Sequence, residues 1–360
     1  MESIYYSITW VCHRRCVHCY EDRFRPYVRD ELKAVVGESL AAWPKIVANL
    51  PERIRYLDLD DPLPDGGYHE KTGRIILSGG EVLHKAVRQP ILYPIMEALQ
   101  AKYGADGAKI VVQTTGDLLT EKIIAELLER GVWMISVAGM DDFHVGMEGE
   151  RRVPLQERLT RWFESAGARD MHRSELSAVT RKWLDEEGPL YSFFGATEDA
   201  WIGKIWPRGR AWANNLSRAQ ITDNFCNAWS GGLNFLNHRY SGSEIAIDAD
   251  GNVYPCCMKT KLAIGNLTEE TVEAILDDLA GHPVYEAISM GHPERMGLAH
   301  GWDMDRFLAA SATVTPGGRP YRNLCIGCDR FHEKVLGPVI NALREQRRAA
   351  RRSLPAVAAQ

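Results

Sequence analysis

Three cysteines close to the start of the chain have a spacing that suits metal chemistry. Cys12, Cys16 and Cys19 follow the pattern Cys-x3-Cys-x2-Cys. Three neighbouring thiolates can hold three irons of a cubane iron–sulfur cluster and leave the fourth iron without a protein ligand. An open metal position allows chemistry, whereas a structural zinc site closes its coordination sphere with four ligands. The alternative is half of a zinc site, completed by His13, His18 or a distant cysteine.

The other five cysteines lie in the C-terminal part of the chain and form a second group. Thiols stay reduced in the cytosol, so we interpret them as metal ligands rather than disulfides. Cys226, Cys256, Cys325 and Cys328 supply four thiolates, enough to close one zinc or one complete cubane cluster. Cys257 is left over. It replaces Cys256 as a ligand, acts as a catalytic thiol, or is a buried apolar residue.

The bulk properties are those of an ordinary globular protein. The chain has 360 residues, of which 45% are hydrophobic and 25% charged, and its net charge is −5. This length suits a large α/β domain with a smaller appendage. The charge predicts no nucleic-acid partner, and no apolar run is long enough to cross a membrane. The chain begins with a strand pattern rather than a signal peptide, so we expect a cytoplasmic protein.

The elements that must position the first cysteines alternate between β-rich runs and helical stretches as far as residue 212, which predicts βα units and a parallel sheet. Apolar residues at helical spacing predict one helix over residues 32–50, interrupted at Pro44, and another over residues 118–128. Residues 58–73 are rich in Asp, Pro and Gly and predict a loop or hairpin. The expected strands are residues 4–9, 74–77, 109–113 and 134–137.

The C-terminal part has a different character. Asp250 and Gly251 form a turn signal between two short β-rich runs and predict a hairpin. A helix is expected over residues 268–279 with Thr268 as its N-cap. Residues 343–360 carry several arginines among alanines and predict a frayed helix with a solvated basic tail.

The stretch from Cys12 to Tyr20 reads Cys-x-x-x-Cys-x-His-Cys-Tyr and resembles the radical S-adenosylmethionine (SAM) enzymes. This resemblance implies a 4Fe-4S cluster whose open iron chelates the amino and carboxylate groups of SAM. One electron then cleaves SAM to methionine and a 5′-deoxyadenosyl radical, which abstracts a hydrogen atom from the substrate. The implied fold is a partial (β/α)6 barrel with its active site at the carboxyl ends of the strands.

Further motifs match the same family. A Gly-Gly-Glu motif follows the strand expected at residues 74–77, with Val82 where the family usually has proline. The resemblance implies that this motif holds the SAM amino group, while two later strand ends contact SAM elsewhere. By this resemblance the SAM-binding residues are Gly79, Gly80, Glu81, Thr115 and Ser136.

The second cysteine group is similar to the auxiliary-cluster extension called SPASM, or to its shorter form, Twitch. Because no cysteine follows Cys328, the resemblance implies a Twitch-like extension with one auxiliary 4Fe-4S cluster. The implied domains are a radical SAM core over residues 1–215, the auxiliary-cluster domain over residues 216–335, and a C-terminal helix and basic tail over residues 336–360.

Two polar stretches are candidates for the substrate side of the site. Residues 141–144, Asp-Asp-Phe-His, follow the fourth expected strand and either face the cavity or form a polar loop. Arg208 and Arg210 either hold a carboxylate or phosphate of the substrate or pair with acidic residues.

These observations predict a radical SAM oxidoreductase that dehydrogenates a small polar metabolite, with the auxiliary cluster as electron acceptor. A carboxylate or histidine from the loops would take the hydroxyl proton. The alternative is a maturase that crosslinks, epimerises or oxidises a ribosomally made peptide. A third interpretation is a zinc-binding module without enzymatic activity. The resemblance also implies flavodoxin or ferredoxin as electron donor.

Overall fold

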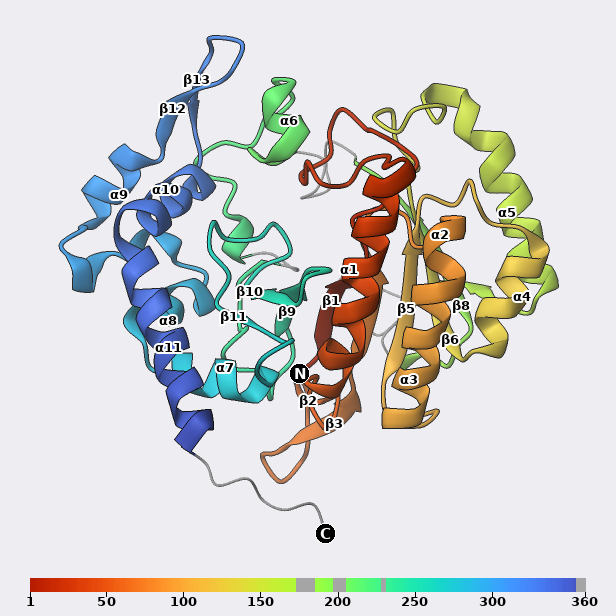
Figure 1. Ribbon diagram of the computed structural model, residues 1–360, viewed down its shortest axis with the longest axis horizontal. Helices are drawn as coiled ribbons and strands as arrows, with labels where there is room; N and C mark the ends of the chain where they lie inside the picture. The colour runs from red at the N-terminus through yellow and green to blue at the C-terminus, as the bar shows by residue number, and fades with distance from the viewer. Residues whose placement is uncertain (173–184, 197–204, 228–230, 354–360) are drawn as a thin grey trace.

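A largely parallel sheet of nine strands runs through the protein (Figure 1), which a computed structural model describes over residues 1–172, 185–196, 205–227 and 231–353. The strand order is β11-β10-β9-β1-β4-β5-β6-β8-β7. All neighbours from β9 to β7 are parallel, while β9, β10 and β11 pair antiparallel. The strands are β1 (Ser3–Ser7), β4 (Arg74–Ser78), β5 (Lys109–Thr114), β6 (Val132–Ala138), β7 (Arg169–Asp170), β8 (Leu190–Phe194), β9 (Glu244–Ile247), β10 (Asn252–Tyr254) and β11 (Gly265–Asn266).

The structure confirms the α/β class and the parallel sheet. In the described part of the chain β11 and β7 are edge strands, so the sheet is open there. All four strands expected from the sequence are present within one or two residues, as β1, β4, β5 and β6. Two antiparallel hairpins lie outside this sheet. They are β2 (Arg55–Pro62) with β3 (Tyr68–Thr72), the hairpin alternative for residues 58–73, and β12 (Ala312–Val314) with β13 (Pro320–Arg322).

Helices alternate with the strands of the sheet. Helices α1, α2 and α3 lie in front of the strands in Figure 1, and α4 and α5 lie beside β6 and β8. The C-terminal helices gather on the other side of the molecule, beside β9, β10 and β11. The helices are α1 (Arg29–Ala48), α2 (Lys85–Val87), α3 (Tyr93–Tyr103), α4 (Glu121–Glu129), α5 (Val153–Ser165), α6 (Gly209–Ala213), α7 (Val272–Leu279), α8 (Pro283–Ser289), α9 (Met304–Ala310), α10 (Leu324–Phe331) and α11 (Gly337–Ser353).

The central strands are buried on both faces. Six of the seven residues of β6 are buried, and Ile4, Ile75 and Ile135 are fully shielded from solvent. Parallel strands covered on both faces carry continuous apolar runs rather than alternating ones. The runs that marked these strands in the sequence therefore reflect their central place in the core.

The C-terminal part joins this sheet next to the first strand. β9 pairs in parallel with β1, with Ile4 opposite Ile245 and Tyr6 opposite Ile247. The predicted hairpin is present, because β9 and β10 pair antiparallel and Gly251 takes the positive φ of +84° that the turn requires. Strand β1 thus lies between β4 from the N-terminal part and β9 from the C-terminal part.

Two helix predictions were wrong in detail. Helix α1 runs through Pro44 without interruption. Proline removes one hydrogen bond near the end of the helix, where Ile46 and Val47 pack into the core and hold the last turn. Helix α7 begins after Thr271, whose hydroxyl accepts from the Ala274 amide at 3.2 Å. Thr268 is held instead in a turn by Asn266.

The prediction of a solvated basic end was wrong for Arg347. Helix α11 begins at Gly337, and Arg347 on it is buried. Its guanidinium donates to Glu270 at 2.8 Å and also pairs with Asp278. These acids belong to the segment around α7, so α11 is docked by buried ion pairs. Residues 354–360 of the predicted tail lie outside the described residues.

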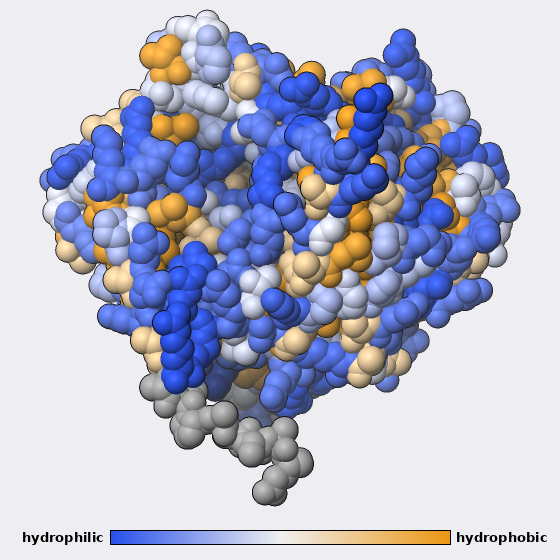
Figure 2. All heavy atoms as spheres, in the orientation of Figure 1, coloured by the Kyte–Doolittle hydropathy of each residue, from blue (hydrophilic) through white to orange (hydrophobic). Residues whose placement is uncertain are grey.

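The visible face of the molecule is mostly hydrophilic, and apolar residues form scattered patches on it (Figure 2). Among the described residues, no helix has both the length and the apolar character needed to cross a membrane.

Candidate functional site

A cavity of about 160 Å³ lies at the carboxyl ends of the parallel strands. It is lined by the last residues of four strands, namely Ser78, Thr114, Ala138 and Phe194. The three N-terminal cysteines line the same cavity. Ligand sites of parallel α/β sheets lie at this edge, so we interpret the cavity as the candidate site.

The cysteines lie on the loop that follows β1, and Arg210 fixes the shape of this loop. The buried Arg210 guanidinium donates to the carbonyl oxygens of Cys16 at 2.9 Å, Asp22 at 3.1 Å and Phe24 at 2.7 Å. Among the described residues Arg210 forms no ion pair with an acid, whereas the alternative that it holds a carboxylate or phosphate of the substrate stays a prediction, since Arg210 lines the cavity. Arg210 holds the cysteine loop by its backbone.

Gly79 and Gly80 allow this loop to approach the end of β4. Two backbone hydrogen bonds join this segment to the loop: the Gly80 amide donates to Thr9 O at 3.0 Å, and the Glu81 amide donates to Val11 O at 2.8 Å. A Cβ on Gly80 would lie 2.3 Å from the Val11 oxygen. Gly79 takes a φ of +140°, which side chains disfavour. The two glycines thus bring the backbone of β4 against the cysteine loop, and both line the cavity.

The structure places Glu81 behind the cavity wall. Its buried carboxylate accepts hydrogen bonds from the Thr114 hydroxyl at 2.7 Å, the Thr115 amide at 2.8 Å and the Leu83 amide at 2.9 Å. Thr115 itself lines the cavity, whereas Glu81 does not. In this arrangement Glu81 ties the β4 and β5 loops together, and its contact with SAM stays a prediction.

Ser136 lies within β6, two residues before the end of the strand. Its hydroxyl bonds that of Ser192 on the neighbouring strand β8 at 2.9 Å, and it is not among the residues that line the cavity. Of the five residues assigned to SAM, the structure thus brings Gly79, Gly80 and Thr115 to the cavity with the cysteines.

Burial makes the thiols of Cys12, Cys16 and Cys19 harder to deprotonate. Burial raises the pKa of Cys12 to about 12 and that of Cys19 to about 11. It also raises the pKa of Cys16. Metal ligands must be deprotonated, so a bound cation would have to compensate the cost of three buried thiolates.

The second cysteine group lines a smaller cavity of about 20 Å³. Cys226 follows Asn224, whose side chain accepts from the Cys226 amide at 3.0 Å, and Cys256 follows β10. Cys325 and Cys328 lie one turn apart on α10. All four thiols line the cavity.

The fifth C-terminal cysteine has a different environment. Cys257 is buried in an apolar cluster with Trp206, Phe225 and Met258, and it does not line the second cavity. This favours the buried apolar residue among the three alternatives for Cys257. We therefore retain Cys226, Cys256, Cys325 and Cys328 as the candidate ligands.

The spacing of the sulfur atoms tests the zinc alternative. Among the described residues, His18, Asp141 and His144 are the one trio of His, Cys, Asp or Glu side chains whose ligand atoms all lie within 4.8 Å of one another. No three thiols of either group meet this limit. Zinc–sulfur bonds of about 2.3 Å place tetrahedral sulfurs about 3.8 Å apart. Neither cysteine group therefore has the close spacing of a tetrahedral zinc shell in this structure, and the assignment of these cysteines as cluster ligands stays a prediction.

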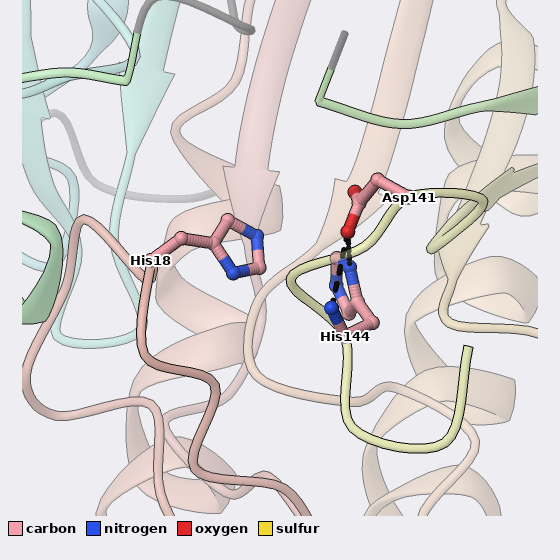
Figure 3. A group of neighbouring side chains, drawn as sticks. All are labelled: His18, Asp141 and His144. Atoms are coloured by element: carbon pink, nitrogen blue, oxygen red, sulfur yellow. Dashed lines mark hydrogen bonds and ion pairs between the residues drawn. The ribbon is translucent and has the colours of Figure 1, made fainter. Parts of the chain in front are cut away.

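The trio itself joins two loops at the first cavity (Figure 3). Asp141 and His144 lie on the loop after β6, and the His18 ring reaches toward them from the cysteine loop. The His18 and His144 ring centroids are 4.6 Å apart, and both rings line the cavity with Asp141. Sequence analysis placed residues 141–144 near the cavity but missed the contact with His18, which only folding creates.

The hydrogen bonds of Asp141 orient His144. Its Oδ1 accepts from His144 Nδ1 at 2.8 Å and from the Phe143 amide at 2.9 Å, and its Oδ2 accepts from the Ala196 amide at 2.9 Å. Burial raises the pKa of Asp141, but the bonds from His144 and Ala196 outweigh it and hold the pKa well below its usual range. An ionised carboxylate can only accept, so His144 Nδ1 donates to Asp141, and Nε2 is the ring nitrogen outside this bond.

His18 remains neutral beside this pair. Burial, together with the nearby His144, lowers the pKa of His18 to about 4. The cavity therefore contains one ionised carboxylate and a neutral His18 ring close to the His144 acceptor.

Comparison with known proteins identifies the C-terminal region. Residues 239–281 match the family model of SPASM, an iron–sulfur cluster-binding domain. This segment contains β9, β10 and Cys256. The protein thus carries a SPASM domain, which confirms the extension predicted from the cysteines. No curated protein matches the chain significantly.

Several solved structures are similar to this fold at low identity. BtrN in complex with AdoMet and 2-DOIA is 16% identical, with 81% of this chain and 88% of that chain covered and a TM-score of 0.41. The structure of anSMEcpe with bound AdoMet is 13% identical, with 95% of this chain and 99% of that chain covered and a TM-score of 0.41. The structure of Streptococcus suis SuiB bound to S-adenosylmethionine is 11% identical, with 80% of this chain and 67% of that chain covered and a TM-score of 0.36.

Proposed function

We propose that this protein is a radical SAM enzyme that dehydrogenates a small polar alcohol. The observation that carries the proposal is the joint placement of Cys12, Cys16 and Cys19 with Gly79 and Gly80 around one cavity at the strand ends. The Cys-x3-Cys-x2-Cys spacing leaves one iron of a cubane open, and this cavity is the space next to it.

Each cofactor has a set of residues to hold it. Cys12, Cys16 and Cys19 would hold the first 4Fe-4S cluster, and the four thiols of the second cavity would hold the auxiliary cluster. Thr115 and the backbone of the two glycines would line the SAM position. When bound, these cofactors supply reductive cleavage of SAM, abstraction of a hydrogen atom from the substrate, and an acceptor for the second electron.

The protein itself supplies the proton acceptor. Oxidation of an alcohol to a carbonyl removes a hydrogen atom from carbon, an electron, and the hydroxyl proton. His144 Nε2 is the acceptor for that proton, because Asp141 occupies Nδ1 at 2.8 Å. This Asp–His pair, which faces the cavity, favours the oxidoreductase over the peptide maturase. General bases of this kind contribute about 10²- to 10⁴-fold to a rate.

The partner that delivers the first electron is proposed from the family resemblance alone. Flavodoxin or ferredoxin would reduce the first cluster from the side of the cysteine loop. Both are electron carriers, and both can be tested directly as replacements for a chemical reductant.

Iron content and SAM cleavage test the proposal. After anaerobic purification and reconstitution, we expect about eight irons per chain. The protein is then incubated with SAM, dithionite and a panel of sugars, cyclitols, aminocyclitols and short peptides, and 5′-deoxyadenosine is measured by mass spectrometry. An alcohol that raises 5′-deoxyadenosine and yields a carbonyl supports the proposal.

Other outcomes would contradict it. About four irons with one zinc would assign the second group to a structural metal and remove the electron acceptor. Stimulation by peptides alone would establish the maturase alternative. Zinc without iron, together with no 5′-deoxyadenosine, would leave a zinc-binding module.

A further inference from the structure

Residues 205–208, which directly precede α6, reach both cavities. Trp206 lines the first cavity, and Arg208, two residues later, lines the second. The Arg208 amide donates to the Trp206 carbonyl oxygen at 2.9 Å, so the chain turns sharply between these two residues. This short stretch is therefore a shared wall, and Arg208 is the residue that it contributes to the auxiliary site.

Arg208 is the one charged side chain among the residues that line the second cavity in the described part of the chain. Apart from the cysteines, the other lining residues are apolar, glycine or a threonine. They are Phe225, Gly231, Met258, Thr260, Ile288 and Leu324. A full positive charge thus faces four thiols across an apolar space.

A half-buried acid pairs with this charge. The Arg208 guanidinium pairs with Asp329, which follows Cys328 on α10 and does not line the cavity. Arg208 Nε is buried and, among the described residues, has no hydrogen-bond partner. A buried donor without a partner costs free energy, so it points to an acceptor that belongs in the cavity.

We propose that Arg208 sets the reduction potential of the auxiliary cluster, with Asp329 moderating its charge. This inference rests on the proposed 4Fe-4S cluster in the second cavity. Reduction adds one negative charge to the cluster, and a nearby cation in an apolar setting stabilises that charge. Net charge and hydrogen bonds to sulfur are known determinants of cluster potentials. Arg208 therefore raises the potential and makes the auxiliary cluster a better electron acceptor.

Charge variants of the reconstituted full-length protein test this proposal. Both cluster potentials are measured by redox titration followed by electron paramagnetic resonance. In Arg208→Gln the charge of Asp329 near the thiolates is uncompensated, and we expect at least a tenfold smaller ratio of reduced to oxidised auxiliary cluster at the wild-type midpoint. For a one-electron couple this is a downward shift of about 59 mV or more. Arg208→Lys retains the charge and should shift less.

Asp329→Asn gives the sharpest comparison, because it should move the potential in the opposite direction. A merely structural ion pair would respond alike to the loss of either partner. The control is Lys261→Gln, since Lys261 and Glu333 form an exposed pair at 3.0 Å and do not line the cavity. The auxiliary potential should be unchanged in the control variant, and the potential of the first cluster should be unchanged in every variant.

Two results would overturn the proposal. One is an unchanged auxiliary potential in both charge variants at full iron content. The other is that Arg208→Gln and Asp329→Asn shift the auxiliary potential in the same direction, or that both variants lose about four irons. Wild-type protein with no auxiliary cluster signal would instead defeat the proposed function, so the two failures are distinguishable.

Discussion

The two cysteine cavities differ in almost every property that governs metal chemistry. The first has a volume of about 160 Å³ and is lined by His18, Asp141 and His144 besides three cysteines. The second has about 20 Å³, four cysteines and mostly apolar walls, with Arg208 as its charged residue. An open site with three ligands suits substrate chemistry, whereas a closed site with four suits electron storage. Under the proposed function, the same ligand type would serve two purposes through the number of ligands and the surroundings.

Loss of a ligand in the first cavity should have the largest effect. Cys12→Ser removes one of only three protein ligands, so we expect about four irons per chain and no 5′-deoxyadenosine from SAM. Iron analysis and mass spectrometry measure both. The matched control is Cys257→Ser, a buried cysteine outside both cavities, which should keep both clusters. A Cys12→Ser protein that still cleaves SAM would contradict the assignment of the first cavity.

Loss of a ligand in the second cavity should separate the two functions. Cys325→Ser should lose the auxiliary cluster but retain SAM cleavage, because the first cavity contains none of its residues. We expect 5′-deoxyadenosine to form while the oxidised product disappears. The ratio of product to 5′-deoxyadenosine is the quantity to measure. An unchanged ratio would show that the second cluster is not the acceptor.

Within the first cavity, the Asp–His pair predicts a smaller effect on the substrate step alone. His144→Gln should lower the rate of product formation about 10²- to 10⁴-fold, with iron content unchanged. Asp142→Asn is the control, since Asp142 is on the same loop but pairs with Arg152 at the surface at 2.8 Å. Equal loss in both variants would indicate damage to the loop rather than loss of a base.

The smallest effect is expected on stability, at the contact between β4 and the cysteine loop. Gly80→Ala places a Cβ 2.3 Å from the Val11 oxygen, and such overpacking costs about 1–3 kcal/mol of unfolding free energy. Gly37 in α1 has open space around it, so Gly37→Ala should stabilise the protein by about 0.5–1 kcal/mol. Urea denaturation measures both. If the two variants had similar unfolding free energies, the cysteine loop would not need the close approach that Gly80 allows.

Sequence reasoning succeeded where the signal is local. The first three cysteines lie within one loop, and the central strands are apolar runs bounded by turns. The placement of the second cysteine group in one cavity depends on contacts between distant segments. Counting thiols and the family resemblance nevertheless predicted the four cysteines that line it. Their common cavity could be expected but not located.

Other features escaped because their causes are tertiary. Glu81 was assigned to SAM by its motif, but its four hydrogen bonds come from Leu83, from Thr114 at the end of β5 and from Thr115 directly after it. The arginines of α11 carry no periodic signal that distinguishes the buried Arg347 from its exposed neighbours. Only packing against the α7 segment makes that distinction.

The pairing of β1 with β4 on one side and β9 on the other has a consequence for how the molecule unfolds. Both edges of the first strand are hydrogen-bonded, one to each half of the chain. A protein truncated after residue 215 would expose one edge of a strand whose Ile4 is fully buried, and such edges aggregate. We therefore expect a single cooperative transition, with the amides of β1 among the slowest to exchange with deuterium. The SPASM extension is in this sense no removable module, because part of the central sheet belongs to it.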